Sequence, residues 1–297
     1  MEPTVVIVNP SAGGGRCGKR ADEALEVLRH RGLALEVHRT QEAGEATAIA
    51  HNWAKAGRRR FLAVGGDGTA HEVLNGLFPW EGTEPPVLGM LPLGTGNSFL
   101  RDFGVTDAGR ALDAIAKGQV RRCDLIKATH AAGDLYYINL LSIGFSAEAG
   151  ELTNRRFKRL GPAGYIAAVL VTAARLHYPS FSIRLDGGPA DARDCVLLSF
   201  SNSKYTGGTM MMAPKADPTD GELDVVRIGR MGKLAFVSAF PSIFKGTHVE
   251  RREVELARAK RVDLDLDGPV DVMVDGEVLR LELRSLEVVP SAVEVWV

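Results

Sequence analysis

The chain has 297 residues, of which 45% are hydrophobic and 25% charged, and its formal net charge is −1 with a sequence pI near 6.7. This length favours two domains, the composition is that of a globular chain with a sizeable core, and the near-neutral charge argues against a nucleic-acid partner. Three scattered cysteines, Cys17, Cys123 and Cys195, lack C-x-x-C spacing, which argues against a disulfide framework or a zinc site.

The first 125 residues alternate short β-rich runs with helical patterns. This alternation predicts a parallel sheet covered by helices, and hence an α/β domain at residues 1–125. The predicted strands are 5–8, 34–38, 60–64 and 87–91, and the predicted helices are 18–31, 45–56, 69–77 and 107–117.

Beyond residue 125 strands dominate, which predicts a β-sandwich or barrel over residues 126–289. The last strand, 293–297, is a candidate for return to the first domain, which would then also contain residues 290–297. The other predicted strands are 135–143, 181–185, 195–201, 223–228, 262–266, 270–274, 278–283 and 286–289, with helical interruptions at 162–176 and 231–244.

A glycine turn, Gly65-Gly66-Asp67-Gly68-Thr69, directly follows the strand-like run 60–64. Glycines reach positive φ without steric cost, so successive N–H groups can form a nest for a phosphate. Asp67 would then be the carboxylate on the side of a magnesium ion. The alternative is an ordinary strand-to-helix turn in which Asp67 caps the helix.

Two further turns follow the first and fourth predicted strands. They are Asn9–Gly15, after the strand 5–8, and the run 91–98, which contains Gly94-Thr95-Gly96-Asn97. Because ligands of open α/β sheets bind at the carboxyl ends of the strands, the three turns predict one shared cleft.

The first turn also contains two patterns that point to other enzyme classes. Gly13, Gly15 and Gly18 spell G-x-G-x-x-G, and Glu36 lies near the place of a ribose-binding acid, as in an NAD-dependent oxidoreductase. Four residues separate the strand from these glycines, which weakens that match. The same segment nearly spells a Walker A loop, but Arg20 stands where a hydroxyl should meet magnesium.

The second half contains one carboxylate cluster in a turn, formed by Asp217, Asp220, Glu222 and Asp224. Oxygen ligands suit magnesium, so this turn is a candidate for a structural ion, although surface turns are commonly acidic and the spacing alone favours an ordinary turn. Asp275-Gly276 is typical of a hairpin turn, and nothing local marks Glu277 as catalytic.

The N-terminus lacks the regions of a signal peptide, and the apolar run 163–174 is shorter than the roughly 20 residues of a membrane span. We therefore expect a cytoplasmic protein. Basic runs at 58–60, 155–159 and 251–252 are candidates for peripheral contact with anionic lipid, although such runs are commonly solvated faces.

Taken together, the motifs resemble those of the diacylglycerol kinase catalytic family, and more remotely sphingosine kinases, NAD kinase and 6-phosphofructokinase. The resemblance covers nearly the whole chain. It is carried by Asn9-Pro10-Ser11-x-Gly13, Thr40, Gly65–Thr69 with Glu72 and Asn75, Gly94–Asn97, Asn139 with Gly144-Phe145, Gly207-Gly208, Ala213-Pro214, Asp220-Gly221 and Asp275-Gly276-Glu277.

The resemblance implies a Rossmann-like α/β domain and a C-terminal β-sandwich domain with helical insertions, with ATP in the interdomain cleft and lipid reaching it from the sandwich. It makes Glu277 the base toward the lipid hydroxyl, Asp67 a holder of catalytic magnesium, Asp124 a member of that acidic network, and Asp217, Asp220 and Glu222 a structural magnesium site. The implied nucleotide contacts are Asn9, Pro10, Ser11, Ala12, Gly13, Thr40, Gly65, Gly66, Asp67, Gly68, Thr69, Glu72, Thr95 and Asn97.

The expected function is therefore ATP- and magnesium-dependent phosphorylation of a membrane lipid hydroxyl, with diacylglycerol as the substrate and phosphatidic acid as the product. A sphingoid base, phosphatidylglycerol or another lipid alcohol are alternatives, and a non-catalytic lipid-binding protein is an alternative of another class. Ser98 stands where bacterial relatives usually have Asp, and Glu148 where related kinases carry a substrate-facing acid. The oligomeric state is left open, with a homodimer as one option.

Overall fold

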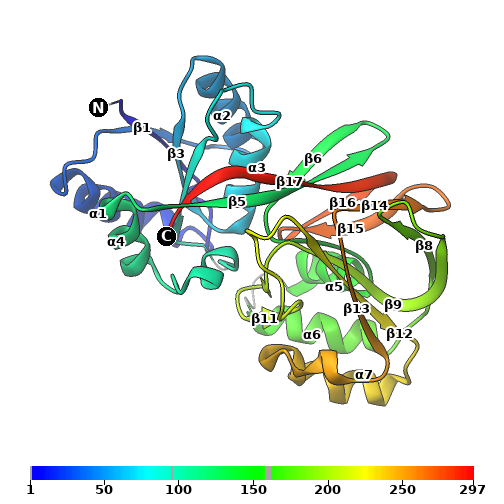
Figure 1. Cartoon of the computed structure of the whole chain (residues 1–297). Helices are drawn as coiled ribbons and strands as arrows, with labels where there is room; N and C mark the ends of the chain where they lie inside the picture. Colours follow the sequence, from blue (N-terminus) through cyan, green and yellow to red (C-terminus); the bar gives the residue numbers. More distant parts are fainter. Residues whose placement is uncertain (1, 95, 158–161) are drawn as a thin grey trace. The chain divides into compact units, whose positions relative to one another are not determined.

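The computed structural model describes residues 2–94, 96–157 and 162–297, which divide into two compact units (Figure 1). Unit 1 comprises Met1–Leu125 with Pro290–Val297, and unit 2 comprises Ile126–Val289. Two strands, β5 (Val120–His130) and β17 (Leu283–Trp296), contribute residues to both units.

Unit 1 is built on a parallel sheet with the strand order β2-β1-β3-β4-β17. Its central strands are continuous apolar runs because helices cover both faces, and every residue of β1 is buried. The strands are β1 (Thr4–Val8), β2 (Leu35–Arg39), β3 (Arg60–Gly65), β4 (Val87–Pro92) and the end of β17.

Helices pack in pairs against this sheet: α1 contacts α4, and α2 contacts α3 (Figure 1). The α2–α3 contact is tight, because a Cβ at Gly76 would lie 2.3 Å from Thr47 O. The helices are α1 (Arg16–His30), α2 (Glu45–Lys55), α3 (Asp67–Leu77) and α4 (Ala108–Lys117), with a 3-10 turn, η1, at Phe99–Phe103. The predicted helices and strands of this part are confirmed, except that α1 and α3 each start two residues earlier, so that α3 includes Asp67.

The C-terminal segment completes the core of unit 1. Glu294 and Val295 pair in parallel with Val87 and Leu88 of β4. Trp296 is only 2% exposed, and a Cβ at Gly89 would lie 2.3 Å from its ring. The indole therefore fills the space that the glycine leaves on the sheet.

Unit 2 has two layers of antiparallel pairs that share the long strand β9 (Asp191–Ser201). One layer has the order β16-β15-β7-β9-β12-β13 and the other the order β6-β5-β17-β14-β8-β9. The strands are β6 (Gly133–Tyr137), β7 (Leu140–Gly144), β8 (Ser180–Leu185), β12 (Leu223–Gly229), β13 (Val254–Ala259), β14 (Arg261–Asp265), β15 (Val270–Val274) and β16 (Glu277–Leu281).

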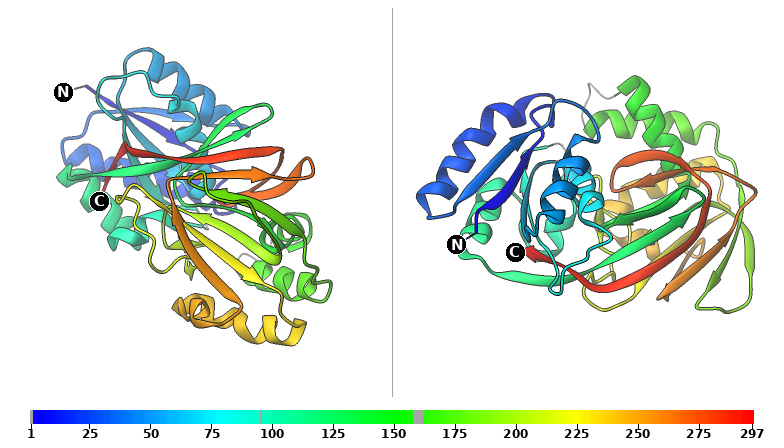
Figure 2. Two further views of the ribbon diagram at one scale, coloured as in Figure 1. Left: turned by 45° about the vertical axis from the view of Figure 1, so that its right-hand side comes forward. Right: turned by 90° about the horizontal axis from the view of Figure 1, so that it is seen from above.

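In the layer β16-β15-β7-β9-β12-β13, alternate residues point to opposite faces and pack into two different hydrophobic clusters. Leu141 and Leu198 belong to the cluster that includes residues of both layers, whereas their neighbours Leu140 and Leu197 pack with the helices. Figure 2 shows these helices on one side of the strands of unit 2. They are α5 (Phe145–Leu152), α6 (Pro162–Ala173) and α7 (Lys233–Ala239), followed by the 3-10 turns η4 (Phe240–Lys245) and η5 (Thr247–Glu250). The prediction of a β-sandwich with helical insertions is confirmed.

Several boundaries in unit 2 differ from the sequence-based expectation. The predicted strand 135–143 is two strands, β6 and β7, interrupted at Ile138-Asn139. The runs 286–289 and 293–297 are parts of the single strand β17. The strands β5 and β13 and the helix α5 had no sequence-based prediction. Among the described residues, no helix has the length and apolarity needed to cross a membrane.

Candidate active site

Three turns meet at one edge of the sheet of unit 1. β1, β3 and β4 are parallel neighbours, so the segments that follow them leave the sheet at the same, carboxyl edge. Leu93 N and Gly94 N both donate to Gly65 O, at 2.9 and 2.7 Å, and a Cβ at Gly94 would lie 2.5 Å from Gly66 Cα. In chain order the three turns are 9–15, 65–69 and 91–98. The second and third of these are therefore packed backbone against backbone, which requires glycine.

The first turn is joined to the same edge through Asn9. Asn9 Nδ2 donates to Thr69 Oγ1 at 3.3 Å, and Asn9 Oδ1 accepts from Ser11 N at 3.1 Å. Pro10 O and Ala12 O accept from the first turn of α1. The side chain of Asn9 thus fixes the loop 9–13 in relation to α3, as a loop that wraps a ligand requires.

The glycines of the first turn adopt left-handed conformations in succession. Gly13, Gly14 and Gly15 have φ of 61°, 70° and 85°, and Gly15 is the N-cap of α1. A Cβ at Gly13 would also lie 3.0 Å from Leu93 O. Only glycine adopts such a run without strain, and the turn approaches the third turn closely at Gly13.

Asp67 stands at the start of α3 and is held by Ser98. Ser98 N donates to both carboxylate oxygens of Asp67, at 3.0 and 3.2 Å, and Ser98 Oγ donates to Oδ2 at 2.9 Å. Asp67 N donates to Gly96 O at 3.1 Å. Ser98 is 2% exposed, so it fixes the orientation of the carboxylate and is not a solvent-facing substitution.

The carboxylate of Asp67 is an oxygen donor of the kind that magnesium binds, and its role as a metal ligand stays a prediction. The carboxylate lies among glycine turns at the positive end of the α3 dipole, and it lines a small depression together with Gly65, Gly66, Asn97 and Ser98. Asn97 Nδ2 donates to Gly94 O at 3.2 Å, which orders the third turn. Thr95 lies outside the described residues.

Thr40 and Glu72 take part in the packing around these turns. Thr40 is 9% exposed at the end of β2, and its N–H donates to Val8 O at 2.9 Å. Glu72 Oε2 accepts from Gly44 N at 3.0 Å, which connects α3 to the start of α2. In both residues the observed contacts order the backbone beside the turns.

Asp124 lies in the part of β5 that belongs to unit 1 and is 1% exposed. Its Oδ1 accepts from Ser291 N at 2.7 Å, so the carboxylate holds the C-terminal segment. Its membership of an acidic network around Asp67 stays a prediction.

Glu277 occupies an exposed position at the beginning of β16 in unit 2. The preceding Asp275 is buried at 4% exposure with φ of 46°. Its carboxylate accepts from the N–H groups of Ile138, Asn139 and Leu140 at 3.0–3.2 Å. Asp275 is therefore more than the ordinary turn residue expected from the sequence, because it anchors the Glu277 hairpin to the segment before β7.

Further buried polar groups support that segment. Asn202 Nδ2 donates to Ile138 O at 2.8 Å, and Ser203 Oγ donates to Asn139 Oδ1 at 3.0 Å. Asn139 and its two partners thus fix the interruption between β6 and β7. Burial, with the nearby charge of Asp275 as a second cause, raises the pKa of Tyr137 well above its usual value.

The acidic turn of unit 2 surrounds an arginine. Arg258 pairs with Asp220, and it reaches Glu222 Oε2 at 2.9 Å and Asp224 Oδ2 at 3.7 Å. Asp217 Oδ1 accepts from Thr219 N and Oγ1 at 3.0 and 2.7 Å. Among the residues that the structure describes, no group of three His, Cys, Asp or Glu is arranged to hold a metal. The structural magnesium site expected at Asp217, Asp220 and Glu222 stays a prediction.

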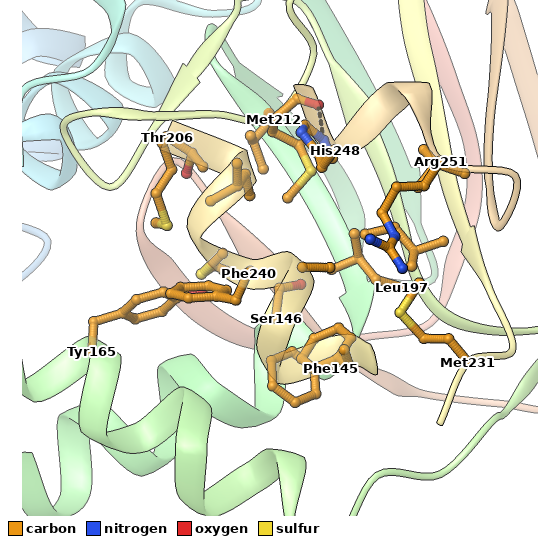
Figure 3. A pocket seen from close by; sticks show the side chains of 18 residues that line it. Phe145, Ser146, Tyr165, Leu197, Thr206, Met212, Met231, Phe240, His248 and Arg251 are labelled. Carbon is orange, nitrogen blue, oxygen red and sulfur yellow. Dashed lines mark hydrogen bonds between the residues drawn. The ribbon is translucent and has the colours of Figure 1, made fainter. Parts of the chain in front are cut away.

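A largely apolar cavity of about 60 Å³ lies in unit 2 between the first strand layer and the helices (Figure 3). Four of the chain's seven methionines line it, namely Met210, Met212, Met231 and Met273. Because methionine is flexible and polarizable, such a wall adapts to an apolar ligand. Sequence reasoning missed this cavity, for which the run Met210-Met211-Met212 was the available signal.

His248 and Arg251 are among the polar side chains that interrupt the apolar wall, together with Ser146 and Thr206. His248 and Arg251 are three residues apart on η5 and its C-cap, and side chains three apart in a 3-10 helix lie on the same side. His248 Nε2 lies 3.1 Å from Met212 O, and Nδ1 has no partner among the described residues. Burial lowers the pKa of His248. Because a carbonyl oxygen only accepts, Nε2 is the donor to Met212 O.

The basic runs differ in how far their charges are already paired. Arg58 pairs with Glu36 at 2.8 Å, and Arg59 pairs with Glu84 and Glu294 at 2.7 Å each. Arg252 pairs with Glu253 at 3.1 Å. In the run 155–159, Arg155 pairs with Glu151 at 3.6 Å, and Lys158 and Arg159 lie outside the described residues.

Glu148 of α5 pairs with His177 at 3.1 Å. Burial raises the pKa of the Glu148 carboxyl, His177 lowers it, and the charges of Asp271 and Glu151 raise it further. A substrate-facing role for Glu148 stays a prediction.

Comparison with known proteins gives consistent results over the whole chain. Residues 3–128 match the family "Diacylglycerol kinase catalytic domain", and residues 139–297 match "YegS C-terminal NAD kinase beta sandwich-like domain". The chain is 31% identical to the diacylglycerol kinase of Mycobacterium tuberculosis, over 97% of this chain and 93% of the relative. It is 27% identical to the diacylglycerol kinase of Bacillus subtilis, over 98% of this chain and 97% of the relative.

Other similar proteins carry related descriptions. The chain is 26% identical to "Probable lipid kinase YegS-like" of Yersinia pseudotuberculosis, over 99% of this chain and 96% of the relative. A solved structure from Bacillus anthracis, provisionally assigned as a diacylglycerol kinase, is 27% identical and superposes with a TM-score of 0.82, covering 99% of this chain and 95% of that chain.

Proposed function

The chain belongs to the diacylglycerol kinase family of lipid kinases, and on this premise we propose that it transfers the γ-phosphate of ATP, in the presence of magnesium, to the hydroxyl of diacylglycerol, forming phosphatidic acid. The proposal assigns the nucleotide to unit 1 and the lipid to unit 2. Since its relatives are lipid kinases, the interpretation of Gly13, Gly15 and Gly18 as a dinucleotide fingerprint is not carried further.

One observation carries the nucleotide part of the proposal: three glycine turns meet around the Ser98-held carboxylate of Asp67. Phosphoryl transfer depends mainly on positioning and on stabilising charge around the γ-phosphate. Turn N–H groups of Gly13, Gly66 and Gly68 suit the phosphate oxygens, since Asp67 N and Thr69 N already donate to Gly96 O and Gly66 O. Asp67 would hold magnesium, which when bound neutralises negative charge on the phosphates.

The contacts of the other unit 1 residues support more limited roles. The Asn9–Gly13 loop is pinned beside α3 by Asn9 and closes around the nucleotide. Thr40, Glu72 and Asn97 order the backbone of the neighbouring loops. Thr95 retains its proposed nucleotide contact from the motif alone.

The hairpin of Asp275 and Glu277 suits a base in unit 2. Glu277 is exposed, and the buried Asp275 holds its turn through three backbone N–H groups. In the proposed step Glu277 accepts the proton of the lipid hydroxyl, the lipid oxygen bonds to the γ-phosphorus, and the bond from that phosphorus to the bridging oxygen breaks to release ADP.

The apolar cavity supports a lipid as the acceptor of the phosphate. Its wall includes Leu140, whose carbonyl accepts from Asp275 N at 3.1 Å, and Met273 of β15. The cavity therefore adjoins the strand that leads into the Glu277 hairpin. We assign it to an acyl chain, which the methionine side chains can move to accommodate.

The test is a transfer assay with labelled ATP and a lipid panel in mixed micelles. The panel contains diacylglycerol, a sphingoid base and phosphatidylglycerol, and label in diacylglycerol is expected. Glu277→Gln should bind ATP with magnesium as the wild type does but lose most transfer, because it cannot accept a proton. Glu282→Gln, an exposed glutamate on the same hairpin, is the matched control and should keep full activity. Label in another lipid, or in none, or full transfer by Glu277→Gln, would contradict the corresponding part of the proposal.

A further inference from the structure

Exposed apolar side chains concentrate on two helical segments of unit 2. Eight large hydrophobic residues are exposed among the described residues, and five of them lie on α6 and on α7 with η4. We call these five the α6–α7 face: Ile166, Leu170, Val171, Leu234 and Phe244, with exposed fractions of 44, 50, 46, 87 and 41%. Scattered single exposures need no explanation, but a group of this kind marks an interaction site.

The elements that carry the five residues are in contact with one another, α6 with α7 and α7 with η4. Ile166 and Leu170 are one helical turn apart and so project from the same side of α6. Lys233 Nζ at the start of α7 donates to Ala174 O at the end of α6 at 2.6 Å, which joins the two helices. Figure 1 shows α6 and α7 side by side.

The segments that contain these helices carry basic and no acidic side chains. None of the chain's 37 acidic residues lies in segments 152–185 or 225–249, although the net charge of the chain is −1. Arg175, Lys233 and Lys245 are exposed at the ends of these helices. The acids of the preceding helix α5 are already paired, Glu148 with His177 and Glu151 with Arg155. An apolar surface bordered by unopposed cations complements an anionic lipid surface.

The same elements form the wall of the apolar cavity. Tyr165, next to Ile166, lines it from α6, and Phe240 lines it from η4. The Phe240 ring packs edge-on against that of the exposed Phe244, with centroids 5.9 Å apart. Figure 3 shows Tyr165 and Phe240 near each other at the cavity. Apolar side chains thus lead from the exposed face to the cavity, as extraction of a lipid chain from a bilayer requires.

We propose that the α6–α7 face docks this chain on an anionic bilayer, with its apolar side chains entering the interface and Arg175, Lys233 and Lys245 meeting lipid phosphates. The purpose of this docking rests on the proposed lipid kinase function, but the vesicle-binding test does not depend on that function. The expectation that the basic runs 58–60, 155–159 and 251–252 contact anionic lipid stays a prediction, and Arg58 and Arg59 of the first run are already paired with glutamates.

The test is sedimentation of the full chain with vesicles of phosphatidylcholine, alone or mixed with phosphatidylglycerol. Wild type should bind the mixed vesicles more tightly, because the cations add to the apolar contact. Leu234→Ser, which removes the most exposed apolar side chain, should weaken binding by roughly tenfold or more, and Leu234→Ser with Phe244→Ser should weaken it further. Leu256→Ser is the matched control, since Leu256 is 40% exposed on β13, and should bind as wild type does.

Measuring phosphate transfer to a water-dispersed short-chain diacylglycerol separates this inference from the proposed function. The serine variants should keep this activity while they lose vesicle binding. Absence of transfer by the wild type with normal vesicle binding would count against the function alone. Vesicle binding by the double variant equal to that of wild type would overturn the docking surface. A dimeric wild type and a monomeric double variant with equal vesicle binding would also overturn it, because the face would then be a contact between two copies of the chain.

Discussion

Replacing Asp275 tests whether a buried carboxylate holds the Glu277 hairpin in place. Asp275→Asn keeps one acceptor oxygen and the left-handed backbone that asparagine tolerates. It turns an amide NH₂ toward one of the three N–H groups of Ile138, Asn139 and Leu140. One unsatisfied buried donor costs about 1–3 kcal/mol, so the free energy of unfolding should fall by that amount.

Asp275→Ala should be more damaging for two reasons. It leaves all three buried N–H groups without the carboxylate, at about 3–6 kcal/mol in total if water reaches part of the space. It also places alanine at a φ of 46°, which adds about 1–2 kcal/mol of strain. The sum is a large share of a typical stability of about 5–15 kcal/mol.

The chain offers a control with similar geometry at the surface. Asp186 has φ of 48°, and its Oδ1 accepts from Lys260 N and Arg261 N at 2.9 and 2.8 Å, but it is exposed. Water can replace the lost acceptor there, so Asp186→Ala should cost less than Asp275→Ala. Urea unfolding, followed by circular dichroism, measures all three variants. Equal destabilisation by Asp275→Ala and Asp186→Ala would refute the reasoning, as would wild-type stability of Asp275→Asn.

Three other predictions concern single carboxylates and one hydroxyl. Asp67→Asn should lower phosphate transfer by about 10²–10³ because one charge contact in the transition state is lost, while the variant still folds, as its circular dichroism spectrum should show; near-normal turnover would remove Asp67 from the metal site. Ser98→Ala removes the hydroxyl that donates to Asp67 at 2.9 Å but keeps the backbone donor. Phosphate transfer should fall by about 10- to 100-fold, as expected for the loss of a charged hydrogen bond, and the magnesium dependence of transfer should change. A rate equal to that of wild type would show that the hydroxyl does not orient the carboxylate. Burial raises the pKa of Asp224 from 3.8 to about 6, although Arg258 lowers it. The folded chain therefore holds a proton that the unfolded chain has lost, and the free energy of unfolding should decrease as pH rises through this range; in Asp224→Asn, urea midpoints should lose this part of the slope, and an identical slope would contradict the assignment.

The architecture of unit 1 was predictable because its signals are local. An apolar run such as Val5–Val8 indicates a strand buried on both faces. The glycines that follow it indicate a turn with positive φ, which other residues rarely adopt. The convergence of the three turns then follows from the parallel order of the strands. The earlier start of α3 places Asp67 in the first turn of the helix and not in the loop before it, and the carboxylate stays at the same edge of the sheet.

The contacts that orient the site were not predictable, because they join distant residues. Ser98 is 31 residues from Asp67, and from the sequence its hydroxyl seemed only to lack the charge of the usual aspartate. Asp275 lies 135–137 residues from the N–H groups that it accepts from. A hairpin pattern predicts the turn but says nothing about which backbone it is tied to.

The acidic turn of unit 2 shows the same limitation for charge. Spacing brought Asp220 and Glu222 together in a loop, which indicated an ion of unknown kind. The partner that the structure places there is Arg258, on the neighbouring strand β13, for which no strand was predicted. Without that strand pairing, the positive charge could not be foreseen.

The participation of β17 in unit 1 constrains how this chain is made and divided. Glu294 and Val295 supply the strand beside β4, and Trp296 fills the core there, yet they are synthesised after all of unit 2. During translation the surface around Gly89 therefore stays uncovered until residues 294–296 have left the ribosome. A fragment cut at residue 125 keeps that gap permanently. A permuted gene that joins residues 290–297 directly to the first 125 would be the way to obtain unit 1 alone.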